Sequence, residues 1–181
     1  MKHLLITAAA LVLTAATALA AEARAEVVDA QPNGFQVKHT AALNAPADKV
    51  YAALALPSRW WNKDHTWSGS AANLSLAPIA GGCFCEKLPN GGSVMHMTVV
   101  YAQPGQGLRL SGALGPLQMS GATGHLAWTL AEKDGRTTLT QTYDVGGYMT
   151  GGLDKIAPVV DQVLGEQFDR LKVYVETGKA P

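Results

Sequence analysis

The feature of this sequence that most constrains its fold is a series of short β-type segments followed by one long amphipathic segment. Gly, Pro and Asn separate the short segments, and the stretches LPNGGS and EKDGRT carry the Asn-Gly and Asp-Gly pairs typical of tight hairpins. Apolar residues then recur at helical spacing from about residue 156 to 176. This order predicts an antiparallel sheet with one face to bury and a long helix that covers it. We predict strands near residues 72–79, 82–88, 93–102, 107–114, 120–131 and 136–145.

The residues before these strands predict one further strand and one or two short helices. FQVKHTAAL, which begins at Phe35, alternates between apolar and polar residues as a strand does. NAPADKVYAAL is typical of a helix, with Pro46 in its first turn, and Pro57 ends it. We therefore expect an α+β chain with seven antiparallel strands, whose short helices lie between the first strand and the second.

The first twenty residues, MKHLLITAAALVLTAATALA, have the pattern of a secretory signal peptide. Lys2 provides a short basic region, an apolar stretch follows, and Ala18-Leu19-Ala20 is a small-x-small cleavage signal. We predict cleavage after Ala20, with a second possible site after Ala25, and a retained membrane anchor is the alternative. The mature chain is thus expected to be periplasmic or secreted, with no stable membrane insertion.

The sequence after the signal peptide predicts a single domain with little net charge. Residues 21–33 show no packing pattern, so we expect a flexible leader there and a domain over residues 34–178. Without Lys2, 13 basic residues stand against 14 acidic ones, and no basic stripe supports nucleic-acid binding. Two cysteines are too few for a disulfide scaffold, and the chain is long enough to bury a core without one.

Three long stretches of the chain resemble the START-like superfamily, also called SRPBCC. They are NAPADKVYAAL before the paired tryptophans, GGCFCEKLPNGGSVMHMTVVYAQPGQGLRLSGALGPLQ, and VGGYMTGGLDKIAPVVDQVLGEQFDRLK. The resemblance covers roughly residues 35–176 and includes the Bet v 1-type, polyketide cyclase and Hsp90-activator-homology branches. It implies the helix-grip fold, in which a curved seven-stranded sheet wraps a long C-terminal helix and a cavity lies between them. The members of such a superfamily differ in function, so the site has to be argued separately.

The two cysteines, Cys83 and Cys85, lie two residues apart in a predicted strand and therefore share one face. Two strand steps of about 3.3 Å place their Cα atoms near 6.6 Å apart, at the upper limit for a disulfide, so that a bulge would be needed to bridge them. A zinc site with His96 would lack a fourth protein ligand, and a reactive thiol near His96 is a third alternative. We expect two small packed side chains, with no metal and no cofactor.

The register of the hairpin that joins the two strands decides what faces these cysteines. A loop with an even number of residues around Asn90-Gly91 sets Cys85 opposite His96 and Cys83 opposite Thr98. A three-residue loop would instead set Glu86 against His96. We favour the even loop because Asn-Gly is a strong two-residue hairpin signal.

The last hairpin indicates a candidate ligand-binding face. A turn at Asp134-Gly135 pairs Trp128 with Gln141, Leu126 with Tyr143 and Leu130 with Leu139, which gives an apolar face with few polar groups. We expect only one of two adjacent tryptophans to face inward. The candidate ligand-binding residues are Trp60, Trp61, Cys85, His96, Trp128, Gln141, Tyr143 and Tyr148.

These observations favour a periplasmic binding protein that holds a small apolar or amphipathic molecule between sheet and helix. The alternative is an enzyme of the cyclase or dehydratase kind, in which His96 is the general acid/base and Tyr143 or Gln141 orients a carbonyl. A third class, a partner-binding protein, follows only from the Hsp90-activator-homology branch. The sequence has no catalytic triad in recognisable context, phosphate loop or dinucleotide-binding motif.

Overall fold

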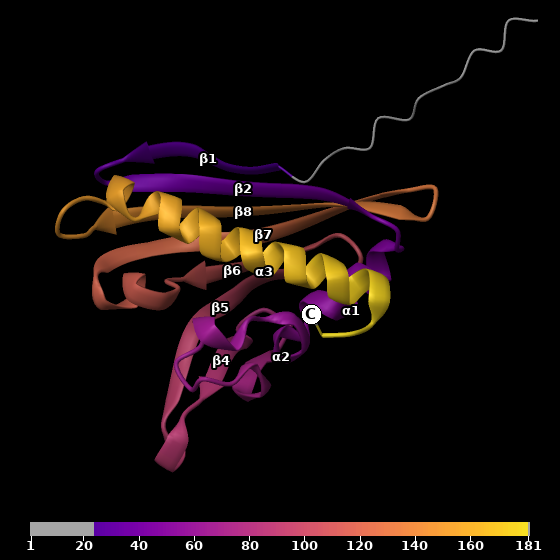
Figure 1. Cartoon of the computed structure of the whole chain (residues 1–181), viewed down its shortest axis with the longest axis horizontal. Helices are drawn as coiled ribbons and strands as arrows, with labels where there is room; N and C mark the ends of the chain where they lie inside the picture. The colour runs from indigo at the N-terminus through magenta and orange to yellow at the C-terminus, as the bar shows by residue number, and fades with distance from the viewer. Residues whose placement is uncertain (1–23, 181) are drawn as a thin grey trace, which may run out of the picture.

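The computed structural model describes residues 24–180 and shows an eight-stranded antiparallel sheet with one long helix across its concave face (Figure 1). The strand order is β1-β2-β8-β7-β6-β5-β4-β3. The strands are β1 (Arg24–Gln31), β2 (Gly34–Leu43), β3 (Leu74–Leu76), β4 (Cys83–Lys87), β5 (Ser93–Gln103), β6 (Gly107–Gly112), β7 (Gly121–Lys133) and β8 (Arg136–Tyr148). The helices are α1 (Ala47–Leu54), α2 (Pro57–Trp60) and α3 (Ala157–Thr177). Short 3₁₀ turns are η1 (Lys63–His65), η2 (Ala71–Asn73), η3 (Pro89–Gly91), η4 (Gly115–Met119) and η5 (Leu153–Lys155).

This arrangement confirms the α+β helix-grip fold and adds one strand to the seven expected. The predicted signal peptide lies outside the described residues. Most of the residues predicted to form a flexible leader are strand β1, which pairs with β2 at the edge of the sheet. A bulge between Val27 and Asp29 interrupts the alternation of β1, and Val28 is exposed while Val27 packs against the core. An edge strand with one exposed face and a bulge has no regular periodicity in its sequence, so it was missed.

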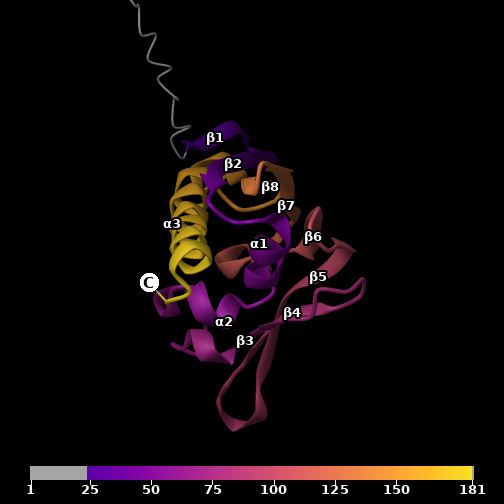
Figure 2. The ribbon, with the colours of Figure 1, turned by 90° about the vertical axis from the view of Figure 1, so that its right-hand side faces the viewer.

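Helix α3 covers the sheet through a stripe of buried residues spaced three or four apart. Leu164, Phe168, Leu171 and Val175 form this stripe. Pro158 lies in the first turn, where its missing N–H costs nothing, and Gly178 ends the helix with a φ of 72°. Figure 2 shows that β3, β4 and α2 form a lobe on the side of α3 opposite to β1 and β2.

The register of the last hairpin is as predicted. Trp128 pairs with Gln141, Leu126 with Tyr143 and Leu130 with Leu139. Asp134 and Gly135 both have positive φ, as the tight two-residue turn between these strands requires.

A buried polar network fills the space between α3 and the middle of the sheet. Trp128 Nε1 donates to Gln141 Oε1 at 2.8 Å, and Gln141 Nε2 donates to His39 Nδ1 at 3.1 Å. His39 Nε2 lies 3.0 Å from Asp161 Oδ1 on α3, a close contact without the alignment of a hydrogen bond. Burial lowers the pKa of His39 despite Asp161, so the ring is neutral and Nδ1 can accept. The centre of the sheet is therefore packed.

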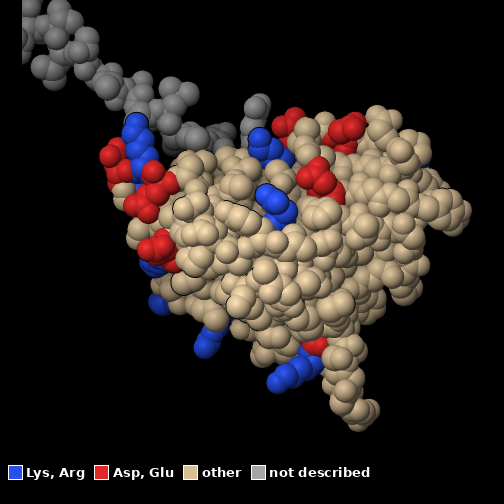
Figure 3. Space-filling model, turned by 180° about the vertical axis from the view of Figure 1, so that it is seen from behind, with Lys and Arg blue, Asp and Glu red and all other residues tan. Residues whose placement is uncertain are grey.

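The opposite face of the sheet carries few charges. Figure 3 shows a broad uncharged area on this side, with acidic and basic residues near its margins. Among the described residues, no helix is long and apolar enough to span a membrane.

Candidate ligand-binding site

A cavity of about 410 Å³ lies beside the N-terminal half of α3, where the lobe of α2, β3 and β4 meets the sheet. Its walls come from four parts of the chain that the fold brings together. These are residues 61–74 (Trp61, His65, Thr66, Trp67, Leu74), strands β4 and β5 (Phe84, His96), residues 114–117 (Leu114, Gly115, Pro116, Leu117) and residues 156–164 (Ile156, Val159, Val160, Val163, Leu164). Most of these side chains are aliphatic or aromatic, as in pockets that bind small organic molecules.

The few polar side chains of the cavity differ in depth. His65 is partly exposed and its Nε2 lies 3.0 Å from Glu166 Oε2 on α3, so this pair lies toward the solvent. The Thr66 hydroxyl donates to the Lys63 carbonyl and is already satisfied. His96 is 93% buried, with 7% of its surface exposed, and is therefore the polar group of the interior.

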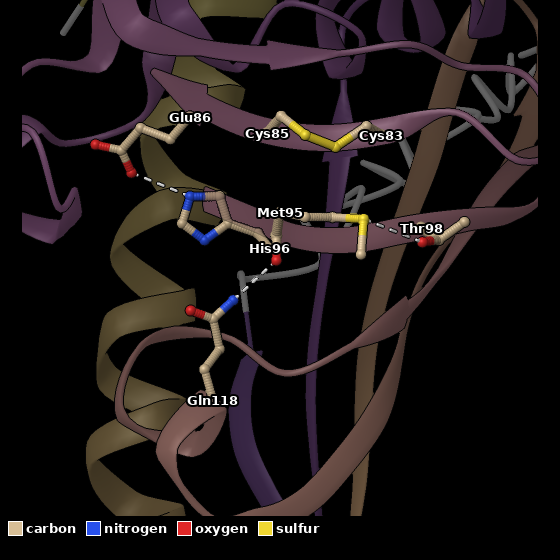
Figure 4. The surroundings of a disulfide bond; sticks show 7 residues. All are labelled: Cys83, Cys85, Glu86, Met95, His96, Thr98 and Gln118. Atoms are coloured by element: carbon tan, nitrogen blue, oxygen red, sulfur yellow. Dashed lines mark hydrogen bonds and ion pairs between the residues drawn. A yellow bond between two sulfur atoms is a disulfide. The ribbon is translucent and has the colours of Figure 1, made fainter. Parts of the chain in front are cut away.

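His96 is held by a carboxylate that sequence analysis did not select. His96 Nε2 lies 3.0 Å from Glu86 Oε2, and Glu86 is only 1% exposed (Figure 4). The Glu86 carboxylate also accepts the backbone N–H groups of Trp67 at 3.1 Å and of Ser68 at 2.5 Å. One buried side chain therefore joins β4, the histidine of β5 and the loop that carries Trp67.

Their environments set the charge of both groups. Burial would raise the pKa of Glu86, but the hydrogen bonds from Ser68, Trp67 and His96 outweigh it, and the pKa is lowered from 4.5. Burial lowers the pKa of His96 from 6.5, and the attraction of Glu86 offsets this only in part. Near neutral pH an ionised Glu86 therefore faces a neutral imidazole. Nε2–H donates to the carboxylate, which leaves a lone pair on Nδ1.

A β-bulge aims His96 into the cavity. Phe84 pairs with Met97 and Cys85 pairs with Met95, so His96 is an extra residue on β5 without a partner on β4. As a result His96 and its neighbour Met97 both face inward, although adjacent residues of a regular strand face opposite sides. The core keeps Met97, and the cavity gains an imidazole.

A disulfide joins Cys83 and Cys85 directly across from this bulge. Their Cα atoms are 5.4 Å apart, well below the 6.6 Å expected for a regular strand and within the range for disulfides. The bond lies on the outer face of β4, beside Met95 and Thr98 (Figure 4). The contracted stretch of β4 thus faces a stretch of β5 that is one residue longer.

This disulfide corrects the expectation of two packed, unpaired cysteines. The even loop was also wrong: Lys87 pairs with Ser93, so an odd number of residues lies between them and Cys85 lies opposite Met95. The bulge then shifts the register by one residue, which sets Cys83 opposite Thr98 as predicted. The described residues contain no free cysteine and no cluster of three potential metal ligands.

The paired tryptophans are both buried, which corrects the expectation that only one faces inward. Helix α2 ends at Trp60, and Trp61 is extended with φ −63° and ψ 139°, so the turn in the chain directs both rings inward. Trp60 Nε1 donates to the Ala53 carbonyl in the core, whereas Trp61 lines the cavity and its Nε1 donates to the His65 carbonyl.

The structure places the other candidate residues outside the cavity wall. Trp128 and Gln141 belong to the buried polar network, and Cys85 lies on the outer face. The Tyr143 hydroxyl accepts the Leu114 N–H at 3.2 Å, and burial raises the pKa of this phenol to about 12. Tyr143 therefore supports the 114–117 segment from behind. Tyr148 is 71% exposed.

The comparisons with known proteins agree with this fold. Residues 34–176 match the model of the family described as "Polyketide cyclase / dehydrase and lipid transport". The chain belongs to this family and, with it, to the START-like superfamily. No curated protein matches the chain.

Several solved structures share the fold at low sequence identity. CalU16 from Micromonospora echinospora has a TM-score of 0.58 at 14% identity, covering 88% of this chain and 87% of its own. A putative uncharacterised protein from Rhizobium leguminosarum has a TM-score of 0.58 at 18% identity, covering 85% and 97%. The Aha1 dimer from Colwellia psychrerythraea has a TM-score of 0.56 at 18% identity, covering 80% and 98%. At this identity these structures indicate the fold alone.

The lowered pKa values predict that the protein loses stability in acid. His39 and His96 have pKa values below 6.5, and Glu86 has one below 4.5, so the unfolded chain takes up protons first as the pH falls. The free energy of unfolding should decrease from about pH 6.5 downward and decrease further below about pH 4.5. Urea denaturation across this range measures it. His96→Gln, whose amide can still donate to Glu86, should show a weaker dependence near pH 6, and an unchanged dependence would contradict the assignment.

The disulfide should stabilise the bulge more than it stabilises the whole protein. It closes a very short loop, so the double variant Cys83→Ser/Cys85→Ser should lose only about 1–2 kcal/mol of unfolding free energy. Amide hydrogen exchange of residues 94–98 should nevertheless become faster, while exchange in β7 and β8 stays slow. Slow exchange at residues 94–98 in the variant would show that the bulge does not depend on the bond.

Proposed function

We propose that this protein binds a small apolar or amphipathic molecule in the cavity between the N-terminal half of α3 and the β4–β5 hairpin. The observation that carries this proposal is a cavity of about 410 Å³ whose wall is almost wholly apolar and contains one buried polar side chain, His96. That volume lies within the usual range for pockets that hold small organic ligands. The family description, which includes lipid transport, points in the same direction.

The wall of the cavity includes two apolar side chains that reach the solvent. Trp67 is 50% exposed, and Val159 at the start of α3 is also exposed. Both contribute apolar surface next to the entrance. A hydrophobic ligand can therefore move out of water onto these apolar side chains before it enters the interior.

We also propose that the protein acts in the periplasm. The signal-peptide pattern of residues 1–20 supports export, and the Cys83–Cys85 bond suits an oxidising compartment.

A second candidate function is an enzyme of the cyclase or dehydratase kind, and the Glu86–His96 pair favours it. A carboxylate that fixes one imidazole nitrogen leaves the other free to accept a proton from a bound molecule. Tyr143, the earlier candidate to orient a carbonyl, is hydrogen-bonded to the backbone instead.

A neutral fluorescent probe tests the binding function. We expect N-phenyl-1-naphthylamine to bind with increased fluorescence, and Val163→Trp on the cavity wall to weaken its binding at least about tenfold by filling the space. Val173→Trp is the matched control, because Val173 lies exposed on α3 and does not line the cavity. Equal loss in both variants, or no binding to the wild type, would contradict the proposal.

Native mass spectrometry of protein released from the periplasm distinguishes carrier from enzyme. We expect the mature chain to begin after Ala20 and to be two hydrogens lighter than its reduced form. A carrier should in addition retain a small organic molecule. For an enzyme, the purified protein should convert that molecule, and His96→Gln should reduce the rate by about 10²–10⁴-fold. Unchanged turnover in His96→Gln would exclude His96 as the acid/base. A chain with residues 1–20 still attached would contradict export with cleavage.

A further inference from the structure

We propose that the ligand of this cavity is an uncharged molecule with an aromatic or similarly flat apolar body and one hydroxyl group, and that this hydroxyl donates a hydrogen bond to His96 Nδ1. The inference rests on the proposed binding function and names the chemical class of the ligand.

His96 presents one ring nitrogen to the cavity without a hydrogen-bond partner in the described part of the protein. Its Nε2 is engaged by Glu86 at 3.0 Å, while its Nδ1 has no hydrogen-bond partner among residues 24–180. The side chain is 93% buried and lines the cavity, and Figure 4 shows the second ring nitrogen pointing away from Glu86. A ring nitrogen that faces the cavity without a protein partner offers an acceptor to any ligand that supplies a donor.

Glu86 fixes His96 Nδ1 as a hydrogen-bond acceptor. Glu86 accepts hydrogen bonds on both carboxylate oxygens, from Ser68 on one and from Trp67 and His96 on the other. Rotation of the carboxylate would break these bonds. The imidazole proton therefore stays on Nε2, and Nδ1 acts as an acceptor.

An acceptor at Nδ1 disfavours ligand groups that can only accept a hydrogen bond. A ligand carbonyl or carboxylate at Nδ1 would place one lone pair against another, and the ionised Glu86 behind the ring adds repulsion for an anion. A fatty-acid carboxylate is therefore disfavoured at this position. A hydroxyl group suits it, since it can donate without carrying charge.

Flat aromatic side chains form the cavity wall around His96. The Phe84 ring lies 5.0 Å from the His96 ring and 5.5 Å from the Trp61 ring, measured between centroids. Three flat side chains side by side favour a flat apolar body, which can stack on one ring and contact the edges of others.

Three naphthalenes of similar shape test the inference on the full mature protein near pH 7. We expect 2-naphthol to bind about three- to tenfold more tightly than 2-methoxynaphthalene, which cannot donate a hydrogen bond. We expect 2-naphthoate, an anion, to bind most weakly. Quenching of tryptophan fluorescence or calorimetry measures the three affinities.

A pair of matched variants locates the effect. His96→Phe keeps an aromatic ring but removes Nδ1, so it should bind the alcohol and the ether with equal affinity. His125→Phe makes the same substitution on the exposed face of β7 and should keep the wild-type preference. Retained binding of the ether shows that His96→Phe is folded.

A measurement on the wild type alone covers the case in which His96→Phe does not fold. Addition of 2-naphthol, but not of its ether, should shift the ¹⁵N resonance of His96 Nδ1. Equal affinity for alcohol and ether in the wild type, or preference for the naphthoate, would overturn this inference and leave the binding function standing. Failure of all three naphthalenes and of N-phenyl-1-naphthylamine to bind would overturn both.

Discussion

The cavity depends on a one-residue mismatch between β4 and β5. Three steps along β5, from Met95 to Thr98, face only two steps along β4, from Cys85 to Cys83. The disulfide spans the shorter side, where the Cα atoms approach to 5.4 Å. Without the extra residue, His96 and Met97 would face opposite sides of the sheet. The bulge lets one strand supply both a core side chain and the polar group of the cavity.

Glu86 converts this local feature into a complete site. Burial of a carboxylate is costly unless hydrogen bonds replace its water, and here two backbone N–H groups and one imidazole do so. The same bonds hold the loop with Trp67 over the entrance and fix the tautomer of His96. The Trp67 loop and the interior of the cavity are thus linked through a single side chain, which explains why an acidic residue is buried behind an otherwise apolar wall.

The sequence allowed the fold to be predicted well and the site only in part. Apolar periodicity and the Asp134-Gly135 turn suffice to predict the pairing of β7 with β8, because a two-residue loop leaves one register. Periodicity also places Phe84 and Glu86 together on one face. It cannot show how many residues form the loop between β4 and β5, or that a bulge follows this loop. The pairing of Cys85 with His96 was therefore wrong. The contact between Glu86 and His96, which was considered only for the rejected three-residue loop, is present in the structure.

The position of the cavity could not be predicted for a related reason. Alternation indicates which face of a strand is covered, but not whether the space above it is filled. Over β7 and β8 it is filled, since Trp128, Gln141 and His39 satisfy one another and contact α3 through Asp161. This network fills the space between β2, β7, β8 and the first half of α3, which it meets at Asp161 and Leu164. The free volume lies beside the same turns of α3 but toward β4 and β5, where short strands and loops replace the continuous sheet. There Glu86 and the bulge determine which chemical group a ligand has to present.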